Sequence, residues 1–320
     1  MILVVDVGTT GLRAALVDPE AAIAAAEYQA FAPDSPFPGL VEFDATEMAR
    51  LVLDAAHAVI DRVGGSPIDG VGVAAQRAST IVWDRATGEP VGPALGWQDL
   101  RTVGECMTAR AEHGLALAPN QSATKVGWLL ANAAAGRSPA DLCVGTVDSW
   151  VVWTLTGGAV HVTDHTNAAV TGLYSIATQQ WNVGVCDTLG IDPSMLPRIV
   201  DSTGVIAAAT ALPGSPPIAG LVGDQQASLI GQGCLERGRA KVTFGTGGML
   251  DVCTGTERPS GAQRSANGTF PIVAWSGGGT THWGVEAIML SAGTNVEWLR
   301  DDMGLIDSAA ASHDVAALCD

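Results

Sequence analysis

Basic residues are scarce in this sequence of 320 residues. Lysine and arginine together number 16, against 33 aspartates and glutamates, so the formal net charge is −17. Binding to nucleic acid requires clusters of Lys and Arg that neutralise phosphates, and the sequence has no such cluster. We therefore expect no nucleic-acid partner. A phosphate site in this chain must instead rely on backbone N–H groups, a metal ion and one or two basic side chains.

Long apolar runs, paired cysteines and a leader segment are missing as well. No uncharged apolar run approaches the length of a membrane span, and the Ala-rich stretch near 204–222 is interrupted by Pro213, Pro216 and Pro217. The six cysteines are scattered without a C-x-x-C pair, as expected for reduced thiols. The N-terminal strand carries Asp6 and follows no basic leader, so no secretory signal is expected. These absences predict a cytoplasmic protein with no membrane partner.

Two segments of the same design, far apart in the chain, are the most informative feature that is present. Each is an apolar strand, a Gly-Thr turn and a second apolar strand, and the turns are Gly8-Thr9-Thr10 and Gly245-Thr246-Gly247. Glycine permits a tight backbone, and Thr hydroxyls beside exposed N–H groups form an anion-binding concavity. Two such turns facing each other across a cleft would hold the phosphates of a nucleotide from both sides.

The order of expected elements around the first turn predicts an α/β fold. A third strand is expected at 22–31, a helix from Asp44 with the Asp-x-x-Glu spacing of a capping box, and a buried strand at 71–75. Three strands, a helix and a further strand form the opening of the ribonuclease-H-like unit of the actin-type ATPases. We therefore expect an actin-like fold with a mixed five-stranded sheet flanked by helices.

The rest of the chain is expected to elaborate this unit and then to begin a second one. Residues 80–215 read as an insertion, with helices from Asp99, over 125–135 and over 147–155. A strand at 218–222 resumes the unit. The second Gly-Thr hairpin is followed by expected strands at 271–275 and 282–284 and a helix over 286–303. The predicted domains are 1–238 and an incomplete second domain over 239–320, since 320 residues are long for one core.

Asp224 is the candidate for catalysis. It directly follows the expected strand at 218–222 and a glycine, and ligands of open α/β sheets gather at strand carboxyl ends. There it could accept the proton of a hydroxyl that attacks a γ-phosphorus. An aspartate ahead of a helix is equally often an N-cap. The residue pattern alone leaves both interpretations open.

Other polar residues near the same turns are candidates for binding. Asp6 ends the first strand and could hold Mg²⁺, or could be a turn residue. Arg13 could reach a transferred phosphoryl group, or be an exposed strand residue. Arg77, Trp97 and Gln225 could form an acceptor site, because Arg and Gln donate hydrogen bonds to hydroxyls and Trp offers an apolar wall. Each of them could equally be structural.

In their order along the chain, these segments resemble the FGGY family of carbohydrate kinases, and within it the glycerol kinase subfamily. The resemblance runs over essentially all 320 residues. The segments that carry it are Asp6-Val7-Gly8-Thr9-Thr10, Gln76-Arg77, Gly96-Trp97-Gln98-Asp99, Gly145–Trp150, His161–Asp164, Thr166–Ala168, Gly223–Ala227 and Phe244–Gly247.

The resemblance implies two actin-like domains that close over ATP, Mg²⁺ and a small sugar or polyol. It implies Asp224 as the general base and Asp6 near the metal. Arg13 and the two Gly-Thr turns would contact phosphate. The acceptor-binding positions match Arg77, Trp97, Asp224 and Gln225.

Three residues depart from the glycerol kinase pattern. Ala78 stands where a glutamate follows the pocket arginine, and Asn120 and Met249 stand at aromatic positions. Losing a carboxylate that grips a hydroxyl costs about 1–3 kcal/mol, so we expect another small polyol or a ketose in place of glycerol. Members of the family are also longer. An unfinished second sheet would expose edges and apolar surface, which is compatible with a homo-oligomer.

Three hypotheses of function follow. The first is ATP-dependent phosphorylation of a small polyol or sugar, with Asp224 as general base. The second is a truncated, catalytically impaired binding or regulatory remnant of such a kinase. The third is an actin- or chaperone-type ATPase switch, which the candidate acceptor residues Arg77 and Trp97 argue against. The sequence identifies neither the acceptor, nor its reacting hydroxyl, nor the oligomeric state.

Overall fold

The computed structural model describes residues 1–64, 66–245, 247–260, 268–289 and 291–318. The chain divides into two compact units. The first comprises Met1–Ala227 and Val273–Thr281, and the second comprises Ser228–Ile272 and His282–Asp320. None of the helices in these described ranges is long and apolar enough to cross a membrane.

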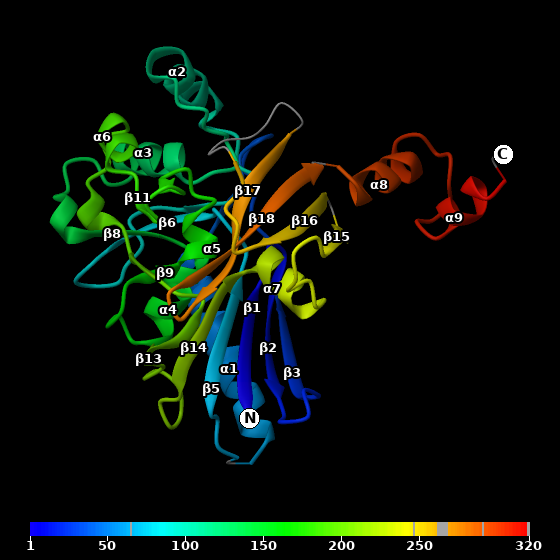
Figure 1. Ribbon diagram of the computed structural model, residues 1–320, viewed down its shortest axis with the longest axis horizontal. Helices are drawn as coiled ribbons and strands as arrows, with labels where there is room; N and C mark the ends of the chain where they lie inside the picture. Colours follow the sequence, from blue (N-terminus) through cyan, green and yellow to red (C-terminus); the bar gives the residue numbers. More distant parts are fainter. Residues whose placement is uncertain (65, 246, 261–267, 290, 319–320) are drawn as a thin grey trace. The chain divides into compact units, whose positions relative to one another are not determined.

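A mixed sheet of six strands forms the centre of the first unit, in the order β13-β14-β5-β1-β2-β3 (Figure 1). Strands β1, β5 and β14 run parallel, and β2, β3 and β13 are antiparallel to their neighbours. The α/β fold with a mixed sheet is as predicted, but the sheet has six strands in place of the five expected. The additional strand is β13, which a short turn folds back onto β14. The bounds are β1 (Ile2–Val7), β2 (Gly11–Val17), β3 (Ile23–Ala30), β5 (Gly70–Ala75), β13 (Thr203–Ala208) and β14 (Pro217–Gly223).

Helices α1 (Ala45–Arg62) and α4 (Val147–Leu155) cover one face of this sheet and contact each other. Alternate residues of β1, Leu3, Val5 and Val7, point into the core between the sheet and these helices. Helix α1 begins where the sequence predicts. The Asp44 carboxylate accepts the backbone N–H groups of Thr46 and Glu47 at 2.8 and 3.2 Å, as an N-cap does.

The insertion after β5 has a core of its own and forms a second sheet together with β4, a short strand that precedes α1. The sheet has the order β4-β7-β6-β8, and α3 packs against β6 over Val82, Leu95, Val126 and Leu129. Helix α2 begins at Val103 and not near Asp99, because the Asp99 carboxylate accepts the backbone N–H groups of Val41 and Arg101 instead. The bounds of these elements are β4 (Glu42–Phe43), β6 (Thr80–Asp84), β7 (Ala94–Leu95), β8 (Leu142–Thr146), α2 (Val103–His113) and α3 (Ala123–Asn132).

Short elements complete the insertion. Strand β9 pairs with β12 and strand β10 with β11. Helix α5 follows β9 directly, and α6 lies between β11 and β12 in the chain. The bounds are β9 (Val162–Asp164), α5 (His165–Ala168), β10 (Tyr174–Ser175), β11 (Gln180–Trp181), α6 (Val183–Thr188), β12 (Arg198–Val200) and the single turns of 3-10 helix Pro139–Asp141 and Pro193–Met195.

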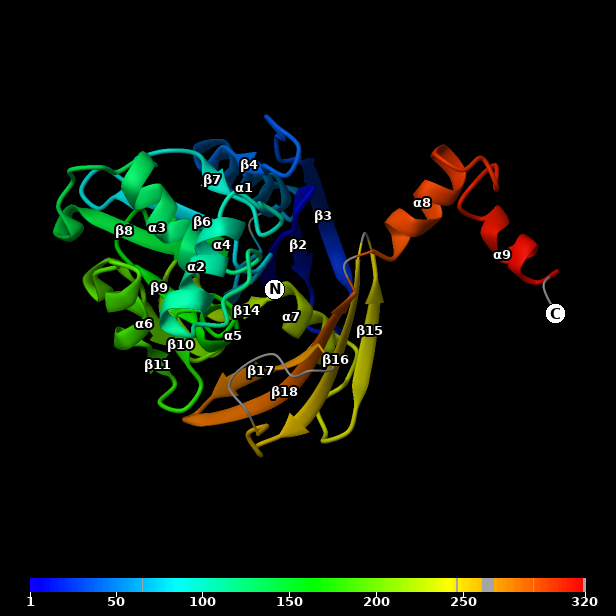
Figure 2. The same ribbon diagram turned by 90° about the horizontal axis from the view of Figure 1, so that it is seen from above.

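A four-stranded antiparallel sheet, in the order β15-β16-β18-β17, follows helix α7 (Figure 2). The helix expected over 286–303 is wrong in its first part: residues 286–289 continue the ladder of β18 with β16, and the helix α8 starts only at Gly293. The tip of the β17–β18 hairpin belongs to the first unit, where Ser276 and Ser202 exchange two hydrogen bonds of 3.1 Å. The bounds are α7 (Asp224–Gly231), β15 (Ala240–Phe244), β16 (Gly248–Gly255), β17 (Thr269–Gly277), β18 (Thr280–Met289), α8 (Gly293–Asp301) and α9 (Ala311–Ala316).

Candidate functional site

The carboxyl ends of three parallel strands meet in one row of the first unit. Val7 of β1 lies opposite Ala75 of β5, and Ala75 lies opposite Gly223 of β14. The residues that follow these strands are therefore brought to the same edge of the sheet: the Gly8 turn, Gln76 with Arg77, and Asp224. This edge is where open α/β sheets bind their ligands.

Gln76 holds the first Gly-Thr turn in place. Its side-chain amide donates to the carbonyl oxygen of Gly8 at 2.9 Å, and its side-chain oxygen accepts the hydroxyl of Ser79 at 2.9 Å. The turn itself closes with the Gly8 N–H donating to the Gly11 carbonyl at 2.9 Å. At Gly11, a Cβ atom would lie 2.2 Å from the Tyr28 hydroxyl oxygen, so a larger residue there would require the exposed Tyr28 ring to move. The sequence alone predicts no role for Gln76, although its position directly after β5 was a usable signal.

Trp97 joins the predicted acceptor site to the predicted phosphate turn. Its backbone N–H donates to the Ser79 hydroxyl at 3.0 Å, and its indole N–H donates to the Thr9 hydroxyl at 3.0 Å. Two residues 88 positions apart, which were predicted for different ligands, are thus in direct contact. The Thr9 hydroxyl keeps its own hydrogen for an anion beside the turn.

Asp224 is the first residue of α7, and Arg77 lies beside it. The Arg77 Nε is 3.5 Å from Asp224 Oδ1; the arginine side chain is 10% exposed and the aspartate side chain 32% exposed. Asp224 Oδ1 also accepts the backbone N–H of Gln225 at 2.7 Å. Arg77 donates further to the side-chain oxygen of Gln226 at 3.4 Å. The carboxylate is therefore oriented by two donors and still reaches solvent, as a residue that meets a substrate must.

Gly223 leaves the space through which Arg77 reaches Asp224. A Cβ atom at Gly223 would lie 2.7 Å from the Arg77 Cδ and 2.8 Å from the Gln226 Oε1. The backbone of Ala78, the next residue after Arg77, is in the left-handed region with φ 63°. The carbonyl oxygen of Ala78 accepts the hydroxyls of Thr80 and Ser122 at 3.1 and 3.0 Å, and these bonds hold the segment in that conformation.

Asp6 and Arg13 lie opposite each other on β1 and β2. Burial raises the pKa of the Asp6 carboxyl, the negative charge of Asp224 raises it further, and Arg13 partly opposes this. Asp6 retains solvent access despite this desolvation. The Arg13 guanidinium lies 6.0 Å from the centre of the Tyr28 ring. The negative charge of Asp224 thus acts on the Asp6 carboxyl at the same edge of the sheet.

A buried network of polar side chains holds the end of β14 through a hydrogen bond to Gly223. Asp164 is fully buried and accepts the hydroxyls of Ser202 and Thr166 at 2.7 and 2.8 Å. The Thr166 hydroxyl in turn accepts the backbone N–H of Gly223 at 2.8 Å. Burial, followed by the charge of Asp164, raises the pKa of the neighbouring Asp148 to about 7. Asp148, Asp164 and Thr166 lie in segments that carry the family resemblance, but the sequence predicts no role for them, and Ser202 lies in none of those segments.

The remaining candidates are Gln225 and the second Gly-Thr turn. The side chain of Gln225 is partly exposed beside Asp224. In the second turn, the Gly245 N–H donates to the Gly247 carbonyl at 2.9 Å, and Gly245 accepts the N–H of Gly293 at 2.8 Å. Thr246 lies outside the described residues. That this turn shares a nucleotide with the first turn stays a prediction.

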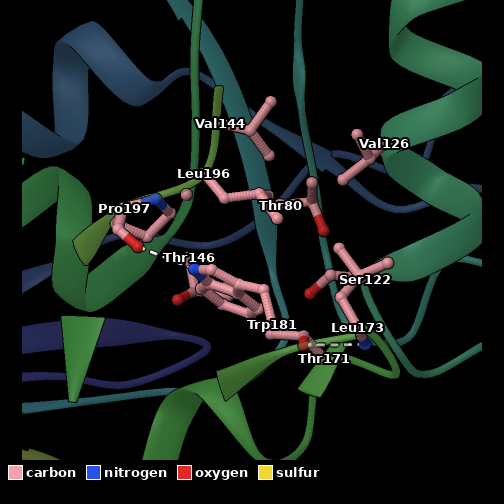
Figure 3. Close-up of a pocket in the computed structure, with 11 residues that line it drawn as sticks. Thr80, Ser122, Val126, Val144, Thr146, Thr171, Leu173, Trp181, Leu196 and Pro197 are labelled. Carbon is pink, nitrogen blue, oxygen red and sulfur yellow. Dashed lines mark hydrogen bonds between the residues drawn. The ribbon is translucent and has the colours of Figure 1, made fainter. Parts of the chain in front are cut away.

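A small cavity lies in the insertion (Figure 3). Its volume is about 20 Å³, which is enough for one water molecule but not for a polyol. It is bordered by Thr80, Ser122 and Trp181, whose indole N–H donates to the Pro197 carbonyl at 2.8 Å. We therefore do not assign this cavity as an acceptor site.

Comparison with known proteins agrees with the geometry. Residues 1–231 match the model of the N-terminal domain of the FGGY family of carbohydrate kinases. Glycerol kinase of Aromatoleum aromaticum is 40% identical over 333 aligned positions, which cover 99% of this chain and 66% of that protein. Glycerol kinase of Alkalilimnicola ehrlichii is 42% identical and is covered to 65%.

Solved structures give the same result for the fold. Glycerol kinase of Plasmodium falciparum, solved with ADP, superposes with a TM-score of 0.90 at 26% identity, over 100% of this chain and 67% of that chain. A xylulose kinase from Rhodospirillum rubrum has a TM-score of 0.84 at 21% identity, over 99% of this chain and 66% of that chain, and this likeness shows the fold alone.

The chain spans about 64–66% of the length of the curated relatives. Within that span the match covers 99% of this chain. The structural neighbours have the actin-like ATPase fold that the sequence predicts. The chain belongs to the FGGY family of carbohydrate kinases.

Proposed function

We propose that this chain carries out, or forms the larger part of an enzyme that carries out, ATP-dependent phosphorylation of a hydroxyl group on a small polyol or sugar. The observation that carries the proposal is the row of strand ends at Val7, Ala75 and Gly223. It brings a carboxylate, an arginine, a tryptophan and a Gly-Thr turn to one edge of the sheet. The glycerol kinases among its relatives support the same reaction class.

Asp224 is the proposed general base. The neighbouring Arg77 and the Gln225 N–H orient its carboxylate, and about a third of its side chain remains exposed to meet an acceptor. In this position it would accept the proton of the acceptor hydroxyl as that oxygen bonds to phosphorus. Arg77 and Gln225 would hold the acceptor by hydrogen bonds, and Trp97 would provide an apolar wall for its carbon chain.

The residues around the first turn fit ATP and Mg²⁺. Bound ATP supplies the phosphoryl group, and Mg²⁺ offsets the negative charge of its phosphates. Asp6 would hold the metal. Burial and the charge of Asp224 raise the pKa of its carboxyl, and a divalent cation would stabilise the charged form. Gly8, Thr9, Thr10 and Arg13 would contact phosphate. Gly245, Thr246 and Gly247 are proposed for the same nucleotide. That the Plasmodium falciparum glycerol kinase was solved with ADP supports a nucleotide as the ligand.

The acceptor is proposed to be a small polyol or a ketose. Glycerol is the acceptor named for the relatives, but Ala78 is buried at the position next to Arg77 and offers no carboxylate for a hydroxyl. A methyl group there removes one hydrogen-bond acceptor from the surroundings of the substrate. A panel of glycerol, erythritol, xylitol, ribulose and xylulose would distinguish these cases.

The test is ADP release by the purified chain with ATP, Mg²⁺ and each member of the panel. We expect Asp224→Asn to lower kcat by about 10²–10⁴, the usual contribution of a general base. The matched control is Asp61→Asn, an exposed aspartate of α1, which should leave kcat unchanged. Full activity of the Asp224→Asn variant would remove this carboxylate from the mechanism.

Two other outcomes point to the other hypotheses. Calorimetric binding of a polyol without ATP binding or turnover would favour the impaired binding remnant. ATP hydrolysis that is independent of every acceptor in the panel would favour an ATPase switch.

A further inference from the structure

The backbone amide of Gly223, the residue directly before Asp224, is bound by a side chain from another part of the chain. Its N–H donates to the Thr166 hydroxyl oxygen at 2.8 Å, although 57 positions separate the two residues. Thr166 lies in α5 and is fully buried. Gly223 is the last residue of β14, and Asp224 is the first residue of α7. The strand end that carries the proposed general base is therefore held by a hydroxyl group from outside the sheet.

Asp164 sets the direction of the Thr166 hydroxyl. A threonine hydroxyl has one hydrogen, and Thr166 donates it to Asp164 Oδ1 at 2.8 Å. The lone pairs of the Thr166 oxygen are then left for the Gly223 N–H. The Asp164 carboxylate is fixed in turn, because Oδ1 also accepts the backbone N–H of Asn167 at 3.0 Å and Oδ2 accepts the Ser202 hydroxyl at 2.7 Å. Asp164 is fully buried, so bulk water does not compete for these donors.

The same network holds β14 at a second point. The carbonyl oxygen of Ser202 accepts the backbone N–H of Leu221 at 2.9 Å, and the Ser202 hydroxyl donates to Asp164. Thr166 and Ser202 thus bind the amides of Leu221 and Gly223 in one strand, and Asp164 joins them. One hydrogen bond would let the strand end pivot, whereas two bonds fix its direction as well as its position.

A displacement of Gly223 would also displace the Asp224 carboxylate, because the two residues are adjacent. Asp224 Oδ1 lies 3.5 Å from the Arg77 Nε and accepts the backbone N–H of Gln225 at 2.7 Å. General base catalysis depends on the distance and the angle between the base and the proton that it accepts. A misplacement of about 1 Å can lower the rate by about 10²-fold. The position of Gly223 is therefore a condition for catalysis by Asp224.

We propose that Thr166 is a positioning residue for phosphoryl transfer. Its hydroxyl, directed by Asp164, fixes Gly223 and thereby orients the Asp224 carboxylate toward the hydroxyl of the acceptor. This inference rests on the proposed function, in which Asp224 is the general base. Thr166 is buried, so it acts through Gly223 and not by contact with a substrate.

Thr166→Val tests this role, because it removes the hydroxyl and nearly keeps the size of the side chain. We expect kcat with the preferred acceptor to fall about 10- to 100-fold, while KM for ATP changes by less than about twofold. Thr166→Ser keeps the hydroxyl and should restore kcat to within about threefold of the unaltered chain. A merely structural role would lower Tm without this difference between kcat and KM.

The matched control is Thr171→Val. Thr171 is also buried, and its hydroxyl likewise accepts one backbone N–H and donates to one oxygen: it accepts from Leu173 at 3.1 Å and donates to the Ala168 carbonyl at 2.7 Å. The two valine variants therefore lose hydrogen bonds of the same kinds, and both should lower Tm. Only Thr166→Val should lower kcat.

Amide hydrogen exchange, measured by NMR on the unaltered chain and on both valine variants, gives a readout that needs no activity. The Gly223 amide reports the bond to Thr166, and the Gln225 amide reports the position of the Asp224 carboxylate that accepts it. Both amides should exchange at least about tenfold faster in the Thr166→Val variant. Neither should change in the Thr171→Val variant.

Three results would overturn the inference. The first is unchanged exchange of the Gly223 and Gln225 amides in the Thr166→Val variant. The second is an equal kcat for the Thr166→Val and Thr171→Val variants of an active chain. The third is a loss of kcat in the Thr166→Ser variant as large as in Thr166→Val, which would assign the effect to the methyl group of Thr166.

Failure of the proposed function would look different. The unaltered chain would then release no ADP with any acceptor of the panel, whatever the variants do. In that case the exchange of the Gly223 and Gln225 amides decides whether Thr166 fixes the Asp224 carboxylate.

Discussion

Single side chains in this protein serve two parts of the site at once. Trp97 was expected to be only a wall for the acceptor, and its indole N–H donates to Thr9 of the predicted phosphate turn. Gln76, which was not expected to contribute, holds the carbonyl of Gly8 in the same turn. Both contacts join residues far apart in the chain, so local sequence patterns do not reveal them.

Trp97→Phe tests the contact between the two predicted sites. The variant keeps an aromatic wall and loses the hydrogen bond to Thr9, so we expect kcat/KM for the acceptor to fall about three- to tenfold, the effect of one net hydrogen bond. Steady-state kinetics with the preferred acceptor measures it. Trp181→Phe is the matched control, because it loses an indole N–H bond to Pro197 at the small cavity. Equal kinetics for the Trp97→Phe and Trp181→Phe variants would contradict the assignment.

At the scale of elements, local signals predicted the regular pieces well. The helix at Val147–Leu155 has the predicted bounds, and α1 starts at the Asp44 cap. Local signals failed where a long-range contact takes priority. Asp99 was expected to begin a helix, but its carboxylate accepts the backbone N–H groups of Val41 and Arg101. The segment 286–289 looks helical but is taken by the ladder with β16.

The site was predictable to the extent that it lies at strand ends. Asp6, Arg77 and Asp224 lie within two residues of the ends of apolar strands, and the structure brings them to one edge of the sheet. The network of Asp164 and Thr166 behind Gly223 was not predictable as support. Its function depends on which backbone N–H lies next to it, and only the fold decides that.

The contact between Arg77 and Asp224 depends on Gly223, at the junction between β14 and α7, because a side chain there would occupy the space of Arg77. Gly223→Ala would place a methyl group 2.7 Å from the Arg77 Cδ, so Arg77 must move away from Asp224. We expect kcat/KM to fall at least tenfold with little change in Tm, because the displaced atoms belong to a flexible side chain. Kinetics and thermal unfolding measure the two effects.

Gly220→Ala on the same strand is the matched control for this change. Its Cβ atom would be 3.6 Å from the nearest atom, the Gly72 Cα, which is an ordinary contact. Activity of the Gly220→Ala variant should stay near that of the unaltered chain. If the two alanine variants lose activity to the same degree, the effect comes from the strand and not from Arg77.

At the scale of the whole molecule, the sequence contains only two lysines, and both are buried. Lys241 pairs with Asp251. Lys125, in α3, is fully buried, and its Nζ has no hydrogen-bond partner within the described residues. Burial lowers the pKa of Lys125 to about 8, with the charge of Asp99 opposing this. Replacing Lys125 and replacing Lys241 are therefore expected to change the free energy of unfolding in opposite directions.

Lys125→Met should stabilise the protein at pH 7, by up to about 3 kcal/mol. Between the folded pKa of about 8 and the unfolded value of about 10.4, the unfolded chain binds more protons. The free energy of unfolding of the unaltered chain therefore rises with pH in this window, and the advantage of the variant shrinks. Urea denaturation followed by tryptophan fluorescence at pH 7, 8.5 and 10 measures the trend.

Lys241→Met is the comparison, and it should destabilise the protein because it removes the cation beside a buried carboxylate. A constant difference between the Lys125→Met variant and the unaltered chain at all three pH values would show that Lys125 does not change its protonation on folding.

The passage of the chain between its two units has a consequence for proteolysis. The segment Val273–Thr281 returns to the first unit, where the paired Ser202 and Ser276 anchor it. A protease that cuts once, between residues 227 and 228, would therefore give two fragments. Residues 273–281 of the second fragment would remain packed in the first unit. Such a nicked protein would run as two bands on a denaturing gel and as one particle in solution.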